Sequence, residues 1–299
     1  SRVRVVAART GESPNEGVTA GSMSVHDSGG ALRQVCAEAR AIYLLAAAAR
    51  LNLAPVAAAK LEVSDGQIGT GDGKVTSYWD LADVALLDCE ACGVARPKPA
   101  GQLQLAAQRV DIPDKVMGHA RFIQDMSLPG MLYGRVLHPP SPGAVLQSID
   151  LQTINALPGV VATVRDGSFL GVIADNEYLA VKALAKLAAL ATWHETPTLP
   201  DMNAMPDFLR SQPAETTVFA EKEGADPASG AREFAAAYSR PFLAHASIGP
   251  SCAVALYQPT SLQVWTHSQG MYNLRADLAV MFDLPADKIA LQHVESAGC

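Results

Sequence analysis

The chain has 299 residues, of which 49% are hydrophobic and 18% charged, and its formal net charge is -7. A chain of this length and composition can bury a sizeable core, and the length predicts about two domains. The negative charge and the absence of Lys or Arg runs argue against nucleic acid or an anionic membrane as a partner.

No membrane span is expected, because the apolar run 41–49 is cut off by Arg40 and Arg50. The first ten residues lack the apolar core of a signal peptide, and the bacterial periplasm and cytoplasm both stay open as locations. Five cysteines are too few for a disulfide framework. Cys89 and Cys92 form a CxxC, which is interpreted either as two ordinary thiols near a loop or as a zinc or redox pair.

The first predicted element is a long, buried helix with Ser28 as its N-cap. Its apolar face has helical spacing and consists of Leu32, Val35, Cys36, Ala39, Tyr43, Ala46 and Ala47. Asp65-Gly66 then predicts a tight hairpin turn. A short helix is expected after Thr76 and Ser77, ending near Leu87, followed by a Pro-containing connector over 95–113.

Residues 110–195 predict a compact α+β domain. The short apolar runs MLYGRVL, GVVATV and FLGVIA are expected as strands, and an apolar helix is expected after Asp175-Asn176. The polar stretch from Thr196 to Gly230 is interpreted as a linker or extended arm. Beyond it the pattern predicts a strand pair (CAVALY and SLQVWTHS), a helix (MYNLRADLAVMF) and a further strand (KIALQHV).

Three segments carry small or polar residues that a plain fold does not need: 10–24, 266–273 and the C-terminal ESAGC. Gly and hydroxyl residues before a helix leave backbone N–H groups for a phosphate or a polar ring edge, although an irregular capping loop is the ordinary alternative. Gln269 offers a donor and an acceptor beside Gly270, or it could cap the next helix together with Ser268. His245 and His267 show no metal-ligand spacing, and no phosphate-binding, dinucleotide-binding or serine-esterase motif is present.

Taken in order, these segments resemble the large subunits of the xanthine dehydrogenase and aldehyde oxidase family. SPNEGVTAGSMSVHDSGGALRQVCAEAR resembles their cofactor-binding stretch. VDIPDKVMGHARFIQDMSLPGMLYGRVLHPPSPGAVLQSID, with LPGVVATV and ADNEYLAVKAL, is similar to their α/β-hammerhead domain. LAHASIGPSCAVALY and the stretch from Trp265 to Cys299 resemble the segment after the hammerhead.

The order of the segments resembles one branch, which contains isoquinoline 1-oxidoreductase and the two-subunit nicotinate dehydrogenases, because a TAGS-type segment precedes the hammerhead. Gly249 stands where many relatives carry Glu, and residues 296–299 replace a Gly-rich run. The resemblance implies an α+β fold with a hammerhead over 108–195, inserted between partial molybdenum-cofactor-binding domains over 1–100 and 230–299.

The resemblance also implies a cofactor, a molybdenum pterin in its cytosine dinucleotide form, with no protein side chain on the metal. Gln269 is the implied catalytic residue, hydrogen-bonding the pterin or the oxo group on molybdenum. The implied cofactor-binding residues are Thr19, Ala20, Gly21, Ser22, Ser24, Gln269, Gly270 and Gly298. Such an enzyme oxidises an N-heterocyclic aromatic compound or an aldehyde, with water as the oxygen source.

A small subunit with iron–sulfur clusters is the implied partner, and a cytochrome is a further candidate acceptor of electrons. This chain lacks the cysteines for such a cluster. It also lacks the family's C-terminal general-base glutamate and a Gly-Gln-Gly cofactor loop, so we expect a part of the subunit that is inactive alone. The alternative hypothesis is a non-catalytic assembly or folding module with the same fold.

Overall fold

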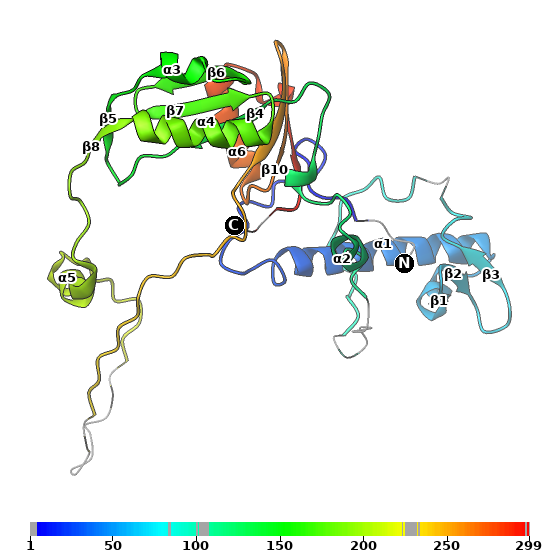
Figure 1. The fold of residues 1–299 in the computed structure, drawn as a ribbon. Helices are drawn as coiled ribbons and strands as arrows, with labels where there is room; N and C mark the ends of the chain where they lie inside the picture. The colour runs from blue at the N-terminus through cyan, green and yellow to red at the C-terminus, as the bar shows by residue number, and fades with distance from the viewer. Residues whose placement is uncertain are drawn as a thin grey trace. The chain divides into compact units, whose positions relative to one another are not determined.

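The structure is a computed structural model that describes residues 5–82, 85–99, 101, 108–222, 224, 232, 234–296 and 298. The chain forms two compact units with mixed helices and strands, an α+β composition (Figure 1). The first unit combines Ser1–Met126 with His245–Cys299, and the second is Ser127–Ala244. The predicted hammerhead began at residue 108, whereas 108–126 belong to the first unit. Among the described residues, no helix is long and apolar enough to cross a membrane.

Helix α1 (Ser28–Arg50) is as long as the sequence predicts, but most of its first half is exposed. Leu44, Ala47 and Ala48 pack in a core, whereas Leu32 and Val35 are 62% and 50% exposed. The prediction of a long, buried helix is therefore confirmed in length and wrong about burial over most of the first half. Ser28 is the first helical residue rather than the N-cap, which is Asp27, and no side-chain bond caps the helix.

A three-stranded antiparallel sheet covers the buried half of α1. It consists of β1 (Glu62–Ser64), β2 (Gln67–Gly69) and β3 (Val75–Ser77), and the 3₁₀ helix η1 (Pro55–Lys60) precedes it. Asp65 and Gly66 have φ angles of 44° and 82°, so the predicted tight turn is confirmed. Ile68 is fully buried in the same core as Leu44.

The helix predicted after Thr76 and Ser77 is wrong for the residues that the structure describes. Both residues belong to β3 and are buried. Ser77 Oγ donates a hydrogen bond to Asp80 Oδ2 at 2.8 Å and accepts one from the Asp80 N–H at 3.1 Å, which closes a turn instead. Residues 83 and 84, within the predicted helix, lie outside the described part, as do 100 and 102–107 of the predicted connector. The connector ends in a short helix, α2 (Ile112–Met117), which η3 (Ile123–Asp125) follows.

The second sheet of the first unit confirms the elements predicted near the C-terminus. Its strand order is β11-β10-β9, with β9 (Ala253–Gln258) antiparallel and β11 (Ile289–His293) parallel to β10 (Ser261–Thr266). Helix α6 (Met271–Phe282) and η5 (Ala286–Lys288) form the crossover between the parallel strands. The buried residues between sheet and helix are Leu262, Val264, Ile289 and Leu291.

The second unit confirms the three predicted strands. Strands β4 (Tyr133–Leu137), β7 (Phe169–Ala174) and β6 (Val160–Asp166) form an antiparallel sheet, and β5 (Val145–Ser148) pairs with β8 (Thr192–His194). Helix α3 (Leu151–Asn155) and the predicted apolar helix, α4 (Glu177–Leu190), are capped by the side chains of Asp150 and Asn176. Buried Leu170, Val172 and Leu187 hold α4 against the sheet.

The predicted linker from Thr196 to Gly230 contains regular structure that the sequence did not indicate. A 3₁₀ turn, η4 (Met202–Ala204), leads into a short helix, α5 (Met205–Ser211). The remaining described residues, up to 222 and from 234 to 244, have no regular secondary structure. Residues 225–230 lie outside the described part of the chain.

Candidate functional site

The N-terminal segment is attached to the edge of the second sheet, beside β11. The His293 N–H donates to Ala8 O at 2.9 Å, and the Thr10 N–H donates to Leu291 O at 2.9 Å. Thr10 Oγ1 in turn accepts the Leu291 N–H at 2.9 Å, and Thr10 is only 5% exposed. These bonds satisfy edge-strand groups that would otherwise be unpaired. They bring the first polar segment to the C-terminal part of the chain.

Tyr272 on α6 makes a second attachment, which no pattern in the sequence indicates. Its hydroxyl donates a short hydrogen bond to Ser13 O and accepts the Gly11 N–H at 3.4 Å. The guanidinium of Arg275 lies 4.8 Å from the centre of the Tyr272 ring. A tyrosine in an amphipathic helix is ordinary in sequence, and only the tertiary contact marks this one.

Thr19 and Gln269 make the third attachment, and both are predicted site residues. The Thr19 N–H donates to Gln269 O at 2.9 Å, and Gln269 Nε2 donates to Thr19 O at 2.7 Å. Gly270 allows this close approach, because a Cβ atom at residue 270 would lie 3.3 Å from Val18 Cγ2. The structure therefore brings the first and second polar segments together.

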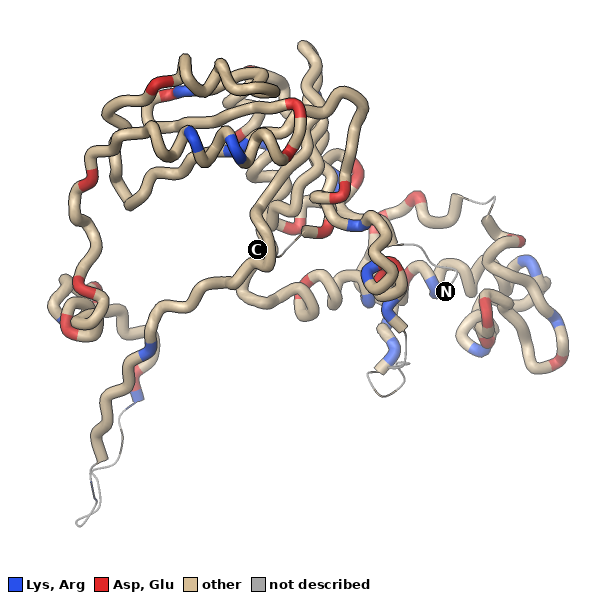
Figure 2. The backbone as a smooth tube through the Cα atoms, viewed as in Figure 1, with Lys and Arg blue, Asp and Glu red and all other residues tan. Residues whose placement is uncertain are grey.

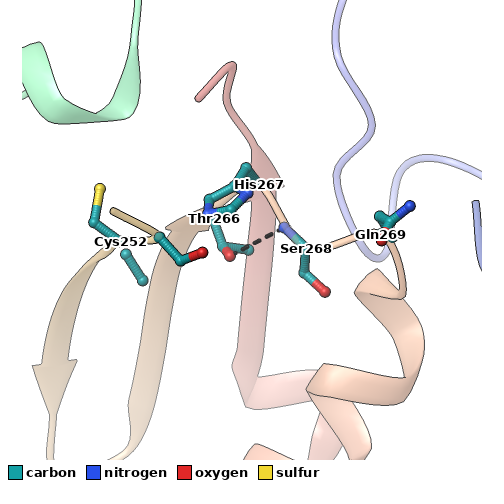
Figure 3. A pocket seen from close by; sticks show the side chains of 7 residues that line it. Cys252, Thr266, His267, Ser268 and Gln269 are labelled. Carbon is teal, nitrogen blue, oxygen red and sulfur yellow. Dashed lines mark hydrogen bonds between the residues drawn. The ribbon is translucent and has the colours of Figure 1, made fainter. Parts of the chain in front are cut away.

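Gln269 does not cap the following helix, so that alternative is wrong. The N-cap of α6 is Gly270, and no side chain caps the helix. Ser268 shapes the loop instead: its Oγ accepts the Gly270 N–H at 3.2 Å, and its own N–H donates to Thr266 Oγ1 at 3.2 Å (Figure 3). The Gln269 side chain is exposed, which leaves its amide oxygen and second amide hydrogen accessible.

A cavity of about 250 Å³ lies between the two joined segments. Four predicted site residues are among those that line it: Thr19, Ala20, Ser24 and Gln269. Gly21 and Ser22 form the turn beside these residues, and Gly270 is behind Gln269. The structure does not bring Gly298 to this cavity; it is exposed, and its neighbours Ala297 and Cys299 lie outside the described residues.

The turn over residues 20–23 presents backbone donors. Gly21 and Ser22 have φ angles of 62° and 58°, and the Met23 N–H closes the turn on Ala20 O at 3.3 Å. Among the described residues, the N–H groups of Gly21 and Ser22 donate to no protein acceptor. The hydroxyls of Thr19 and Ser24 are likewise not engaged with described protein groups. Such a set of short donors suits an anionic or polar ligand.

The electrostatics of the cavity are mixed. The N-terminal end of α1 opens on it through Asp27 and Ser28 and supplies a positive helix-dipole end. Glu16 and Asp27 oppose that field, although Asp27 Oδ1 is paired with His26 Nδ1 at 2.7 Å. His293, whose position the sequence did not single out, also lines the cavity. Burial, with His267 nearby, lowers the pKa of His293 below its ordinary value of 6.5.

A second, more open cavity of about 410 Å³ lies where β9 begins and β10 ends. Figure 3 shows Cys252 on the β9 side, Thr266 at the end of β10, and His267, Ser268 and Gln269 between β10 and α6. Ser251 and Ala253 complete the lining. Gln269 therefore borders both cavities.

Cys89 and Cys92 have neither metal-ligand surroundings nor a disulfide in the structure. Both are exposed, and no group of three potential metal ligands occurs among the described residues. Their loop is bound to α1 by Glu38, which is 7% exposed and accepts the N–H groups of Cys92 at 2.6 Å and Gly93 at 2.5 Å. These contacts fix the backbone of the loop and leave both interpretations of the two thiols open.

Comparison with known proteins gives one extended match in sequence. The chain is 33% identical over 312 aligned residues to a subunit of nicotinate dehydrogenase from Pseudomonas putida, a match that covers 100% of this chain and 26% of the relative. The chain thus spans about a quarter of the length of that relative. No protein-family model matches the chain.

Solved structures give weaker likenesses. The match to quinoline 2-oxidoreductase from Pseudomonas putida 86 covers 64% of this chain and 30% of the quinoline 2-oxidoreductase chain, at 20% identity and a TM-score of 0.49. The match to CO dehydrogenase from Oligotropha carboxidovorans covers 64% of this chain and 34% of the CO dehydrogenase chain, at 16% identity and a TM-score of 0.37. TM-scores below 0.5 do not define a fold. The likeness in sequence to this nicotinate dehydrogenase subunit therefore runs along the whole chain.

Proposed function

We propose that this chain is the molybdopterin-binding part of a molybdenum hydroxylase that oxidises an N-heterocyclic aromatic compound or an aldehyde. Its cofactor would be a molybdenum pterin in the cytosine dinucleotide form. The observation that carries the proposal is the reciprocal pair of hydrogen bonds between Thr19 and Gln269, because it joins two polar segments from opposite ends of the chain around one cavity.

The donors around the cavity fit part of such a cofactor. A pyrophosphate takes hydrogen bonds from backbone N–H groups and hydroxyls near a helix N-terminus, and the turn over residues 20–23 offers both beside α1. The volume of about 250 Å³ is below the roughly 300–1,000 Å³ of a typical ligand pocket. The cavity would therefore supply one wall of the cofactor site, and the carboxylates of Glu16 and Asp27 would have to face away from the phosphates.

In this proposal the chain binds and orients, while the cofactor supplies the oxidation of carbon with water as the oxygen source. Thr19, Ala20, Gly21, Ser22 and Ser24 would hold the pterin or its pyrophosphate. Gln269, fixed to Thr19 O by one amide hydrogen, would direct its other hydrogen to the pterin or to the oxo group on molybdenum. Gly270 keeps the backbone close behind it, and Gly298 would contact the cofactor from the C-terminal segment.

The proposed assembly includes a second subunit. Iron–sulfur clusters need about four cysteine ligands each, and the described cysteines of this chain form no such group. Electrons would therefore leave through a small iron–sulfur subunit and, in one version, reach a cytochrome. We also propose that the sheet β4-β7-β6 with α4 is the core of an α/β hammerhead.

The test is nucleotide binding by a variant of the turn. Gly21→Ala places a side chain at φ 62°, where the donor turn would be strained, and Gly167→Ala introduces the same kind of strain at φ 55° in the second unit. The chain is produced with its partner subunit in a host that makes the cofactor, and CMP released by acid is measured per chain. We expect CMP in the unsubstituted protein and in Gly167→Ala, and a loss in Gly21→Ala. Absence of CMP from the unsubstituted protein and from both variants would instead favour a non-catalytic assembly module.

A further inference from the structure

The C-terminal segment that begins at Glu295 is held by a group of side chains far away in sequence. Arg121 donates from one guanidinium nitrogen to Glu295 Oε1 at 3.0 Å, and Lys115 Nζ lies 2.9 Å from Glu295 Oε2. Lys115 also pairs with Asp111 at 2.7 Å. Figure 2 shows acidic and basic residues gathered around α2, where this Glu295 cluster of Asp111, Lys115, Arg121 and Glu295 lies.

The backbone of the same segment is fixed next to the cluster. The Ile123 N–H donates to Glu295 O at 2.8 Å, and Ile123 is 1% exposed. Asp125 shapes this short turn by accepting the N–H groups of Arg121 at 3.0 Å and Phe122 at 2.9 Å. Glu295 is thus bound through its backbone carbonyl by the buried residue Ile123 and through its carboxylate by Arg121 and Lys115.

Gln124 bridges two segments, one of which leads into the cavity of about 410 Å³. Its Nε2 donates to Ser296 Oγ at 2.9 Å and to Pro250 O at 3.3 Å. Pro250 directly precedes Ser251, Cys252 and Ala253, which line the cavity of about 410 Å³. One amide group therefore sets the distance between the segment at 250–253 and the segment after Glu295.

We propose that Arg121 and Gln124 are positioning residues, which hold the 250–253 segment and residues 295–296 at the separation that the cofactor site needs. This rests on the proposed function, which assigns Gln269 and Gly298 to that site; Gln269 lines the same cavity as Ser251, Cys252 and Ala253. Neither residue is among those that line the cavity, and they act through Glu295, Ser296 and Pro250.

The test uses the thiol of Cys252 as a reporter of the 250–253 segment. Brief labelling with N-ethylmaleimide and peptide mass spectrometry give the rate at Cys252, with exposed Cys89 and Cys92 in the same protein as internal references. The variants are Gln124→Leu, which keeps the bulk without the amide, and Arg121→Gln, which removes the ion pair between Arg121 and Glu295 and leaves that of Lys115. The matched control is Arg135→Gln, because Arg135 pairs with Glu177 at 2.6 Å and its side chain is 29% exposed, against 30% for Arg121.

Loss of the Gln124 or the Arg121 contact should raise the labelling rate of Cys252 about fivefold or more relative to that of Cys89, since a segment with fewer contacts exposes its thiol to the reagent more often. Arg121→Lys keeps a positive charge beside Glu295, so the Cys252 labelling rate should return close to that of the unsubstituted protein. Arg135→Gln should leave the Cys252 labelling rate unchanged. The thermal midpoint of Gln124→Leu should match that of the control. An unchanged Cys252 rate in both variants, or an equal rise in Arg135→Gln, would overturn the proposal. Labelling needs no cofactor, so a protein without molybdenum would contradict the proposed function and leave this result standing.

Discussion

Thr19 and Gln269 are 250 residues apart and exchange two hydrogen bonds, of 2.9 Å from the Thr19 N–H and 2.7 Å from Gln269 Nε2. The pair closes the N-terminal loop onto the end of β10. Because neither side chain is buried, the bonds contribute little to overall stability, and their consequence is the shape of the cavity between the segments.

Gln269→Ala should separate a binding role from a stabilising one. The amide is exposed, so the fold should survive with a loss of about 0.5–1.5 kcal/mol in the free energy of unfolding. Turnover per bound molybdenum in the assembled enzyme should fall about 5- to 150-fold, as expected when a polar group at the cofactor loses its partner. Gln263→Ala, on strand β10 that precedes this loop, is the control. Turnover per molybdenum equal to that of the control would rule out the assigned role.

Thr10→Val should destabilise the attachment of the N-terminal segment. Valine keeps the shape of the side chain but removes the acceptor of the Leu291 N–H, leaving that buried donor unpaired at a cost of about 1–3 kcal/mol. Thr10→Ser keeps the hydroxyl and should lose much less. Denaturant unfolding of both variants measures the difference, and equal stability of the two would show that the bond has no net effect.

Glu295 should make the protein sensitive to acid. Lys115, and then Arg121, lower the pKa of Glu295 below its ordinary value of 4.5. The ionised carboxylate therefore stabilises the fold above that value, and this contribution is lost as the pH falls through the lowered pKa. The stability difference between the unsubstituted protein and Glu295→Gln should be constant above about pH 6 and shrink toward zero in acid. A difference that stays the same or grows in acid would contradict the ion pairs.

Gly66→Ala should weaken the small sheet that packs on α1. The added Cβ would lie 2.3 Å from the Trp79 ring, whereas Gly73, at a φ of 93°, has open space around it. Both substitutions strain a positive φ, so the extra loss in Gly66→Ala, about 1–3 kcal/mol, reports overpacking against Trp79. Thermal unfolding followed by tryptophan fluorescence measures it. Equal midpoints for Gly66→Ala and Gly73→Ala would mean that the ring moves away without cost.

Local pattern was enough to predict the elements that are regular and apolar on one face. The strand pair β9-β10, helix α6, strand β11 and helix α4 all follow from alternation or helical spacing. The helix expected after Thr76 failed because β2 pairs with Thr76 and Ser77 as a third strand, a contact that spacing alone does not reveal. The prediction that the first half of α1 is buried was wrong for a related reason. Helical spacing identifies an apolar face, but it does not show which element covers that face.

The candidate site was partly predictable for the same reason. Small and polar residues in the segments 10–24 and 266–273 are visible in the sequence, and the structure brings those segments together. The contacts that hold them were not predictable, because Thr10 with Leu291, Tyr272 with Ser13 and Arg121 with Glu295 are all long-range pairs. His293 became a cavity residue only through its place at the end of a strand parallel to β10.

Molybdenum content per chain tests the central claim most directly. The protein is produced with its iron–sulfur partner in a host that makes the cytosine dinucleotide cofactor, and the metal is measured by mass spectrometry against protein concentration. We predict about one molybdenum per chain, with CMP released in the same ratio, as expected when the cofactor rather than the protein supplies the metal ligands. Protein that is fully folded and assembled with its partner, yet carries neither molybdenum nor CMP, would contradict the claim.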